Sequence, residues 1–150
     1  MNDEARPRVL FVDDEDHNLA TLRRVFRRDY EMSFAASVAE AIELIRTQRF
    51  DVAFVDYAML GMSGLELLSA ADEIQPLMGR VMLTAHADLA EVALANAIGL
   101  SAAVLSKPWS RGVIRGWVEH FRAQASARRT MQRMALLSAA SAGPRSESEG

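Results

Sequence analysis

Cysteine is absent from the 150-residue sequence, and long apolar runs are absent as well. Without cysteine the chain forms no disulfide, holds no metal through thiolates and has no thiol nucleophile. No run approaches the ~18–20 apolar residues that a membrane-spanning helix needs. The polar first eight residues lead into an apolar run at 9–12, which is too short for the hydrophobic region of a secretion signal. We therefore expect a cytoplasmic protein with no membrane partner.

The chain has almost no lysine, and neither positive nor negative charge is in large excess. The chain has 17 lysine and arginine residues against 20 acidic residues, and Lys107 is the only lysine. The net charge of −3 predicts no polycationic surface for nucleic acid. Half of the residues are hydrophobic and a quarter are charged, which is an ordinary composition for one globular domain with a substantial core.

Short apolar runs alternate with segments of helical periodicity along the chain. Three of these runs are continuous and rich in β-branched or aromatic residues, as in strands that are buried on both faces. A weaker run at 32–35 is typical of an edge strand. Repeated strand–helix units imply an α/β doubly wound fold, in which helices cover both faces of a parallel sheet. The five predicted strands comprise residues 9–12, 32–35, 52–55, 81–83 and 102–105.

The segments between the strands carry signals of helix faces and helix starts. In the first segment apolar residues recur on one face, opposite a group of arginines; they are Leu19, Leu22, Val25 and Phe26. Ser37 and Glu40 have the spacing of a capping box, and Asp88 with Glu91 marks the start of a later helix. Ser110 is the predicted cap of the last helix, whose core-facing stripe comprises Val113, Ile114, Trp117, Val118 and Phe121.

The last helix is predicted to be longer than a single domain needs. Its helix-favouring sequence continues past residues 121–125 to about residue 140, and Gly143-Pro144 ends it. One interpretation is that two copies pair as a short coiled coil; the other is a solvated, fraying helix. Its arginines favour a solvated face over a nucleic-acid surface. The pairing hypothesis rests on roughly heptad-like positions, which are Phe121, Ala125, Arg128, Met131 and Leu137.

Chemistry-bearing residues follow four of the predicted strands. Asp13-Asp14 follows the first strand, Asp56 the third, Thr84 the fourth and Lys107-Pro108 the fifth. Ligands of an open parallel sheet bind beyond the carboxyl ends of its strands, so these groups are expected to converge. Clustered carboxylates suit a hard cation such as Mg²⁺, and a carboxylate can accept a phosphoryl group as an acyl phosphate. The sole lysine supplies a compact positive charge where the rest of the chain uses arginine.

These residues resemble the receiver domain of bacterial two-component response regulators over about residues 7–122. The matching motifs occur in the family's order, and they are Val12–Glu15, Val55–Met59, Gly61–Glu66, Leu83–Ala85 and Lys107–Trp109. The resemblance implies a flavodoxin-like fold with five parallel strands in the order 2-1-3-4-5, which is also the strand order of the chemotaxis receiver. It also divides the chain into a receiver domain at 1–122, a helical extension at 123–141 for dimerisation or linkage, and a disordered tail at 142–150.

The resemblance assigns roles residue by residue. Asp56 accepts the phosphoryl group, and Thr84 and Lys107 contact it afterwards. Lys107-Pro108 corresponds to the family's cis peptide. The resemblance implies a Mg²⁺ ion with Asp14 as a direct ligand and Asp13 as a ligand largely through water. Asp56 and the backbone carbonyl of Ala58 complete the implied metal site.

The implied function is a phosphorylation switch and not a turnover enzyme. The expected partners are a sensor histidine kinase or phosphotransfer protein, and a downstream effector or fused output domain. No effector motif follows the receiver, so the chain is either a stand-alone receiver or the front piece of a longer regulator. Two departures from the family pattern, Leu60 and Val104, are expected to alter the acceptor loop and the switching of the face around the fifth strand. Ala58 and His86 occupy positions that tune phosphoryl lifetime in the family.

Two other functions are compatible with parts of this pattern. A phosphohydrolase of the haloacid dehalogenase type also uses an aspartate nucleophile, but it needs an Asp-x-Asp pattern after its first strand. Here Asp13 is followed two positions later by Glu15. A phosphate-independent, receiver-like protein-binding module is the main alternative, and Leu60 and Val104 keep it open.

Overall fold

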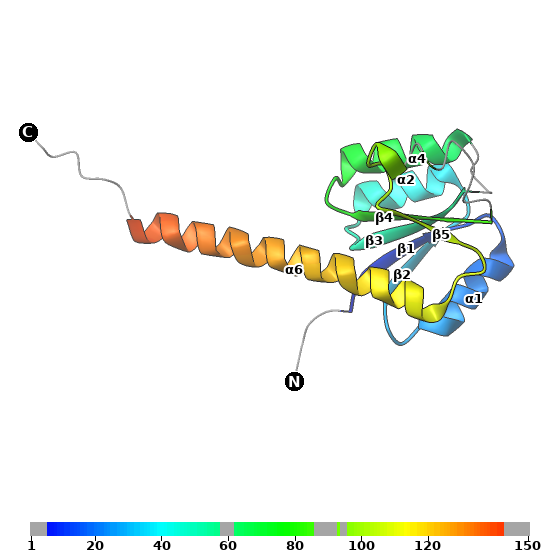
Figure 1. Cartoon of the computed structure of the whole chain (residues 1–150), viewed down its shortest axis with the longest axis horizontal. Coiled ribbons are helices and arrows are strands. Elements are labelled where there is room, and N and C mark those ends of the chain that lie inside the picture. Colours follow the sequence, from blue (N-terminus) through cyan, green and yellow to red (C-terminus); the bar gives the residue numbers. More distant parts are fainter. Residues whose placement is uncertain (1–5, 58–61, 86–92, 94–95, 143–150) are drawn as a thin grey trace, which may run out of the picture.

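The computed structural model describes residues 6–57, 62–85, 93 and 96–142 (Figure 1). Five strands form one sheet in the order β2-β1-β3-β4-β5, and every pair of neighbours is parallel. This result confirms the predicted fold class and strand order, with β2 and β5 at the edges. The strands are β1 (Arg8–Val12), β2 (Glu31–Ala35), β3 (Val52–Asp56), β4 (Gly79–Thr84) and β5 (Ala103–Ser106).

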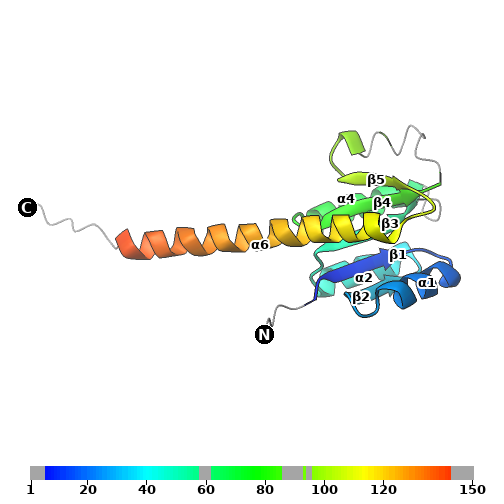
Figure 2. The ribbon, with the colours of Figure 1, turned by 60° about the horizontal axis from the view of Figure 1, so that its bottom comes forward.

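Helices cover both faces of the sheet. Figures 1 and 2 show α2 and α4 on one face, and α1 with the beginning of α6 on the other. The helix expected to begin near Asp88 lies largely outside the described residues. The described helices are α1 (Asp16–Phe26), α2 (Val38–Thr47), α4 (Met62–Ile74) and α6 (Arg111–Ala142).

The central strands are buried on both faces because alternate residues point into two separate cores. Along β1, Leu10 and Val12 join the core under α2 and α4, whereas Val9 and Phe11 join the core under α1 and α6. β3 is fully buried along its length. Its Phe54 ring stacks on that of Phe11 with a centroid separation of 5.4 Å. The continuous apolar runs of the sequence therefore reflect burial on two sides.

Local capping signals fix where two helices begin. The Ser37 hydroxyl accepts a hydrogen bond from the Glu40 backbone N–H at 3.1 Å, and the Glu40 carboxylate accepts one from the Ala36 N–H at 2.7 Å. Ser110 caps α6 by accepting from the Val113 N–H at 3.1 Å. Both predicted helix starts are thus confirmed.

The apolar stripe of α6 is narrower than the sequence predicts. Ile114, Val118 and Phe121 are buried and Trp117 packs against the same core. Val113, however, is 45% exposed, so its assignment to the stripe is wrong. The helix contacts the sheet along positions i, i+4 and i+7, and Val113 lies one residue, or about 100°, before that line.

The second half of α6 extends away from the sheet as a single unbroken helix (Figures 1 and 2). The whole of α6 has 32 residues, which correspond to a length of roughly 48 Å. The helix reaches Ala142, one residue beyond the predicted limit of the extension, and the rest of the predicted tail lies outside the described residues. Within the described chain, no helix combines the length and hydrophobicity needed to cross a membrane.

Two of the predicted heptad positions of α6 already make contacts within the predicted receiver domain. Phe121 is buried in the core, and the Arg128 guanidinium donates a hydrogen bond to the Leu77 carbonyl at 3.3 Å. The apolar residues left on one exposed face of the helix are Met131, Met134 and Leu137, which are 68%, 62% and 62% exposed. The surface available for pairing therefore begins nearer the carboxyl end of α6 than the sequence indicates.

Candidate functional site

The parallel arrangement brings the carboxyl ends of β1, β3, β4 and β5 to one edge of the sheet. Asp56 is the last residue of β3 and pairs in register with Leu83, next to Thr84 at the end of β4. Thr84 in turn pairs with Ser106, the residue before Lys107. Neighbouring strands thus carry the predicted site residues to a common end of the sheet.

Lys107 joins the two buried carboxylates of this edge. Its Nζ lies 3.0 Å from Asp56 Oδ2 and 3.8 Å from Asp13 Oδ2. The side chains of Asp56 and Asp13 are 5% and 7% exposed, whereas that of Lys107 is 24% exposed. A partly buried ammonium that is shared by two buried carboxylates offsets part of the cost of removing their charges from water.

The backbone around Lys107 holds its side chain over the site. The Lys107 N–H donates to the Thr84 carbonyl at 2.8 Å, and the Lys107-Pro108 peptide bond is cis, as the resemblance implies. Thr84 itself is fully buried at the end of β4. Asp56, Thr84 and Lys107 therefore lie on three adjacent strand ends, as expected.

Asp13 is oriented by the start of α1. Its Oδ1 accepts from the Glu15 N–H at 2.9 Å, and its Oδ2 accepts from the Asn18 side-chain amide at 3.0 Å. The Asn18 amide also donates to the Glu15 carboxylate at 3.0 Å. The sequence analysis did not identify Asn18; the available signal was its place one turn into the helix that follows Asp13-Asp14.

Of the remaining predicted metal ligands, the structure describes only Asp14, which differs from Asp13 and Asp56 in its exposure. Asp14 is exposed, and within the described part of the chain no three acidic or histidine side chains form a cluster that could hold a metal ion. Ala58, Leu60 and His86 lie outside the described residues. The carboxylate oxygens of Asp13 and Asp56, with Asp14 next in the chain, nevertheless form the kind of donor set that suits Mg²⁺.

Comparison with known proteins identifies the class to which this fold and site belong. The response regulator receiver domain family matches residues 9–119, so the chain belongs to that family. It is therefore a receiver domain of two-component response regulators, a class that acts as phosphorylation switches.

Individual relatives agree with the family assignment. A solved structure described as an adenylate cyclase from Rhodopirellula baltica is 30% identical, with a TM-score of 0.77 over 87% of this chain and 97% of that chain. A CheY-like receiver domain protein from Methanospirillum hungatei is 27% identical, with a TM-score of 0.73 over 82% of this chain and 99% of that chain.

A curated relative shows that receivers of this kind occur in longer proteins. The hydrogenase transcriptional regulatory protein HoxA of Cupriavidus necator is 31% identical over 102 residues, which are 67% of this chain and 21% of the relative. The matched region thus spans about a fifth of that relative's length.

Proposed function

We propose that this receiver accepts a phosphoryl group on Asp56 in a Mg²⁺-dependent reaction. The observation that carries the proposal is the 3.0 Å contact between Lys107 Nζ and Asp56 Oδ2 at the carboxyl edge of the sheet. A buried carboxylate that is paired with one compact cation is held in a fixed orientation while it remains ionised, as a nucleophile must be. The donor is the phosphohistidine of a sensor histidine kinase or of a phosphotransfer protein.

In the transfer, an oxygen of Asp56 bonds to phosphorus while the bond between phosphorus and the donor's imidazole nitrogen breaks. The electron pair of that bond stays on the imidazole. Lys107 can then pair with a phosphoryl oxygen, and the Thr84 hydroxyl can donate to another. Asp13, Asp14, Asp56 and the Ala58 carbonyl would hold Mg²⁺, which supplies positive charge to the phosphoryl oxygens when it is bound.

The consequence of phosphorylation is a change in the surface presented to an effector protein or fused output domain. Val104, on β5, is partly buried and packs against the core under α2 and α4. Because valine has no ring to move inward, we propose that switching around β5 is built differently from that of receivers with an aromatic residue there.

We also propose that the exposed stripe of Met131, Met134 and Leu137 pairs with a second copy of the chain. These side chains lie about 60° apart around the helix on one face, which gives a short seam for a partner helix. The proposal extends the linker or dimerisation role expected for the helical extension.

Intact-mass measurement after incubation with acetyl phosphate tests the phosphoryl proposal. We expect a gain of one phosphoryl group that requires Mg²⁺ and is absent from Asp56→Asn. Asp72→Asn is the matched control, because Asp72 pairs with Arg80 and not with Lys107, and it should gain the group normally. No gain in the unaltered chain at any Mg²⁺ concentration would favour the phosphate-independent binding module instead.

A further inference from the structure

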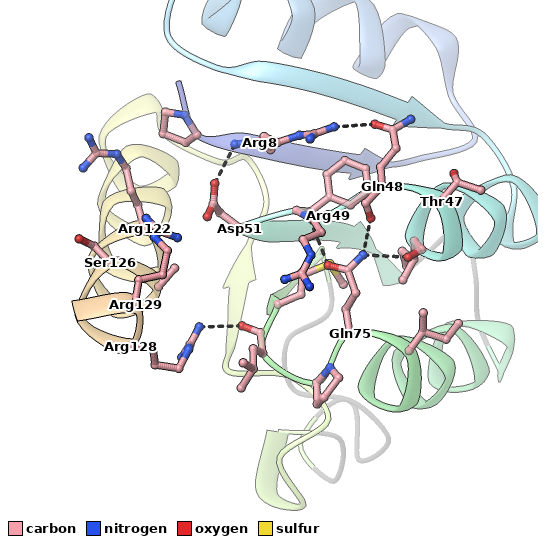
Figure 3. Close-up of a pocket in the computed structure, with 18 of the residues that line it drawn as sticks. Arg8, Thr47, Gln48, Arg49, Asp51, Gln75, Arg122, Ser126, Arg128 and Arg129 are labelled. Atoms are coloured by element: carbon pink, nitrogen blue, oxygen red, sulfur yellow. Dashed lines mark hydrogen bonds between the residues drawn. The ribbon is translucent and has the colours of Figure 1, made fainter. Parts of the chain in front are cut away.

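A large cleft lies at the amino-terminal edge of the sheet, opposite the edge that bears Asp56. It has a volume of about 1130 Å³ and is bounded by the start of β1, the α2–β3 and α4–β4 connections and the extended part of α6. Figure 3 shows Arg128 and Arg129 on the α6 side of the cleft, and Arg49 and Gln75 on the other side. Asp13, Asp14, Asp56, Thr84 and Lys107, the described residues assigned to the phosphorylation site, do not line it.

The lining of the cleft is strongly basic. Among the described residues that line it, the only acidic one is Asp51, whose carboxylate accepts a hydrogen bond from the Arg8 backbone N–H at 2.9 Å. This basic cleft occurs in a chain whose net charge is −3. Seven lining residues are arginines, namely Arg6, Arg8, Arg46, Arg49, Arg122, Arg128 and Arg129.

Several of these guanidinium groups have free hydrogen-bonding capacity. Among the described residues, the side chains of Arg46, Arg49 and Arg129 have no hydrogen-bond or ion-pair partner. The Arg128 guanidinium donates one hydrogen bond, to the uncharged backbone carbonyl of Leu77. Two of the lining arginines do have carboxylate partners: Arg8 pairs with Glu31 and Arg122 with Glu119, each at 3.9 Å. The positive charge without such a partner among the described residues is therefore concentrated on Arg46, Arg49, Arg128 and Arg129 in a concave region.

Hydrogen bonds fix the walls of the cleft. The Gln75 side-chain amide donates to the carbonyls of Ile45 and Gln48, and its oxygen accepts from the Phe50 N–H at 3.2 Å. These bonds tie the end of α4 to the α2–β3 connection, while Arg128 ties α6 to Leu77. The arginines thus project from supports that are already held in place.

We propose that this cleft binds a small ligand that carries two or more linked phosphate groups. A guanidinium fork matches phosphate in a bidentate manner, and one compact polyanion can engage several arginines that converge from separate segments. A single phosphate would leave most of them unneutralised, and the carboxylates of an acidic peptide are spaced farther apart along its chain. The volume of about 1130 Å³ lies slightly above the ~300–1,000 Å³ range of small-molecule sites, so the cleft is large enough for such a ligand. The proposal is independent of phosphorylation at Asp56.

Isothermal titration calorimetry at physiological salt, without divalent cations, tests the proposal. The probes are inorganic tripolyphosphate, orthophosphate and ATP at matched ionic strength. We expect tripolyphosphate to bind about tenfold more tightly than orthophosphate, or tighter still. ATP that binds more tightly than tripolyphosphate would identify a nucleotide as the ligand, whereas equal affinities would identify the polyphosphate group alone as the recognised feature.

Two double variants distinguish binding in the cleft from nonspecific attraction of anions to the positive charge of the protein. Arg49→Ala with Arg129→Ala removes two unpartnered cations from opposite walls and should weaken tripolyphosphate binding by about tenfold or more. Arg24→Ala with Arg28→Ala makes the same charge change at exposed positions outside the cleft and should alter affinity by less than about twofold. Circular dichroism verifies that both variants remain folded.

Three results would overturn the assignment. They are the absence of saturable tripolyphosphate binding, equal weakening by both pairs of substitutions, and tighter binding of an oligoglutamate peptide than of tripolyphosphate. The last result would assign the cleft to an acidic protein segment.

Discussion

At the scale of single residues, Lys107 connects two buried carboxylates of the candidate site. It is the only lysine, and its Nζ is shared between Asp56 and Asp13 at 3.0 and 3.8 Å. The remaining contacts of Asp13 come from a backbone N–H and from the Asn18 amide, neither of which carries a full charge. Removing the ammonium would therefore remove the cation that the two neighbouring buried carboxylates share.

We expect Lys107→Gln to lower the free energy of unfolding by about 1–3 kcal/mol in the absence of Mg²⁺. The penalty should shrink in an Asp56→Asn background, because only one buried carboxylate then remains beside the altered position. Urea unfolding of the four chains in this double-mutant cycle measures the coupling. A cost for Lys107→Gln that is equal in both backgrounds would show that Lys107 and Asp56 are energetically independent.

Tyr30 provides a second residue-scale prediction. Burial raises the pKa of its phenol to about 12, with Arg115 lowering it and Asp29 raising it. Because the folded-state pKa lies above the ordinary tyrosine value of 10.0, the protonated phenol stabilises the fold below pH 10. That contribution should be lost between pH 10 and about 12. The ultraviolet difference titration of the chain against Tyr30→Phe checks this, and ionisation near pH 10 would contradict it.

At the scale of elements, the packing of α6 on β4 depends on a missing side chain. Gly79 opens β4, and a Cβ there would overlap with the ring of Phe121 on α6. The ring is held because Ile114 and Val118 anchor the same helix in the core. The close approach of helix and strand thus requires glycine at this position.

We expect Gly79→Ala to destabilise the protein by about 1–3 kcal/mol, since overpacking shifts the ring or the helix. Gly116→Ala is the matched control: its added Cβ meets open space, and alanine in a helix interior should stabilise by about 0.5–1 kcal/mol. Urea denaturation of both variants provides the test. Destabilisation by both substitutions would show that the Phe121 contact is not the cause.

The element scale also shows where local sequence patterns succeed. Ser37, Glu40 and Ser110 were sufficient to predict two helix starts, because a cap needs only residues three positions apart. Val113 was assigned wrongly to the core because the two sides of an apolar stripe look alike in the sequence. Which side is buried depends on how the helix rotates against the sheet.

At the scale of the whole molecule, the protruding half of α6 bears the stripe that we propose pairs with a second copy of the chain. We expect a weak, concentration-dependent dimer, because Met131, Met134 and Leu137 offer only two turns of apolar seam. The helix bears no acidic residue after Glu119, so arginines of the two copies repel, and added salt should strengthen the dimer. Light scattering at several concentrations and salt levels measures both effects.

Substitutions on opposite faces of α6 test the seam itself. Met134→Glu with Leu137→Glu should give a monomer at all concentrations. Gln132→Glu with Ala139→Glu adds the same charge to the opposite face and should leave the dimer intact. A constant monomeric mass for the unaltered chain would exclude pairing through α6.

The sequence by itself determined the alternation of strands and helices, the two-sided burial of the central strands and the residues that end them. Those features depend on local periodicity, and in a parallel sheet the strand ends meet at one edge wherever they stand in the chain. The doubly wound α/β class and the convergence of Asp13, Asp56, Thr84 and Lys107 could therefore be predicted from the sequence, and the resemblance to receiver domains added the strand order.

Only the tertiary structure decided which side chains from different elements contact one another, because no sequence pattern links them. The Asn18 contact with Asp13 depends on the angle at which α1 leaves β1, and the basic cleft joins arginines from separate segments that no motif links. The tertiary structure also decided the length of the pairing seam on α6, because Phe121 and Arg128 already contact the rest of the domain. Periodicity encodes neighbours within an element, whereas contacts between elements are set by packing in three dimensions.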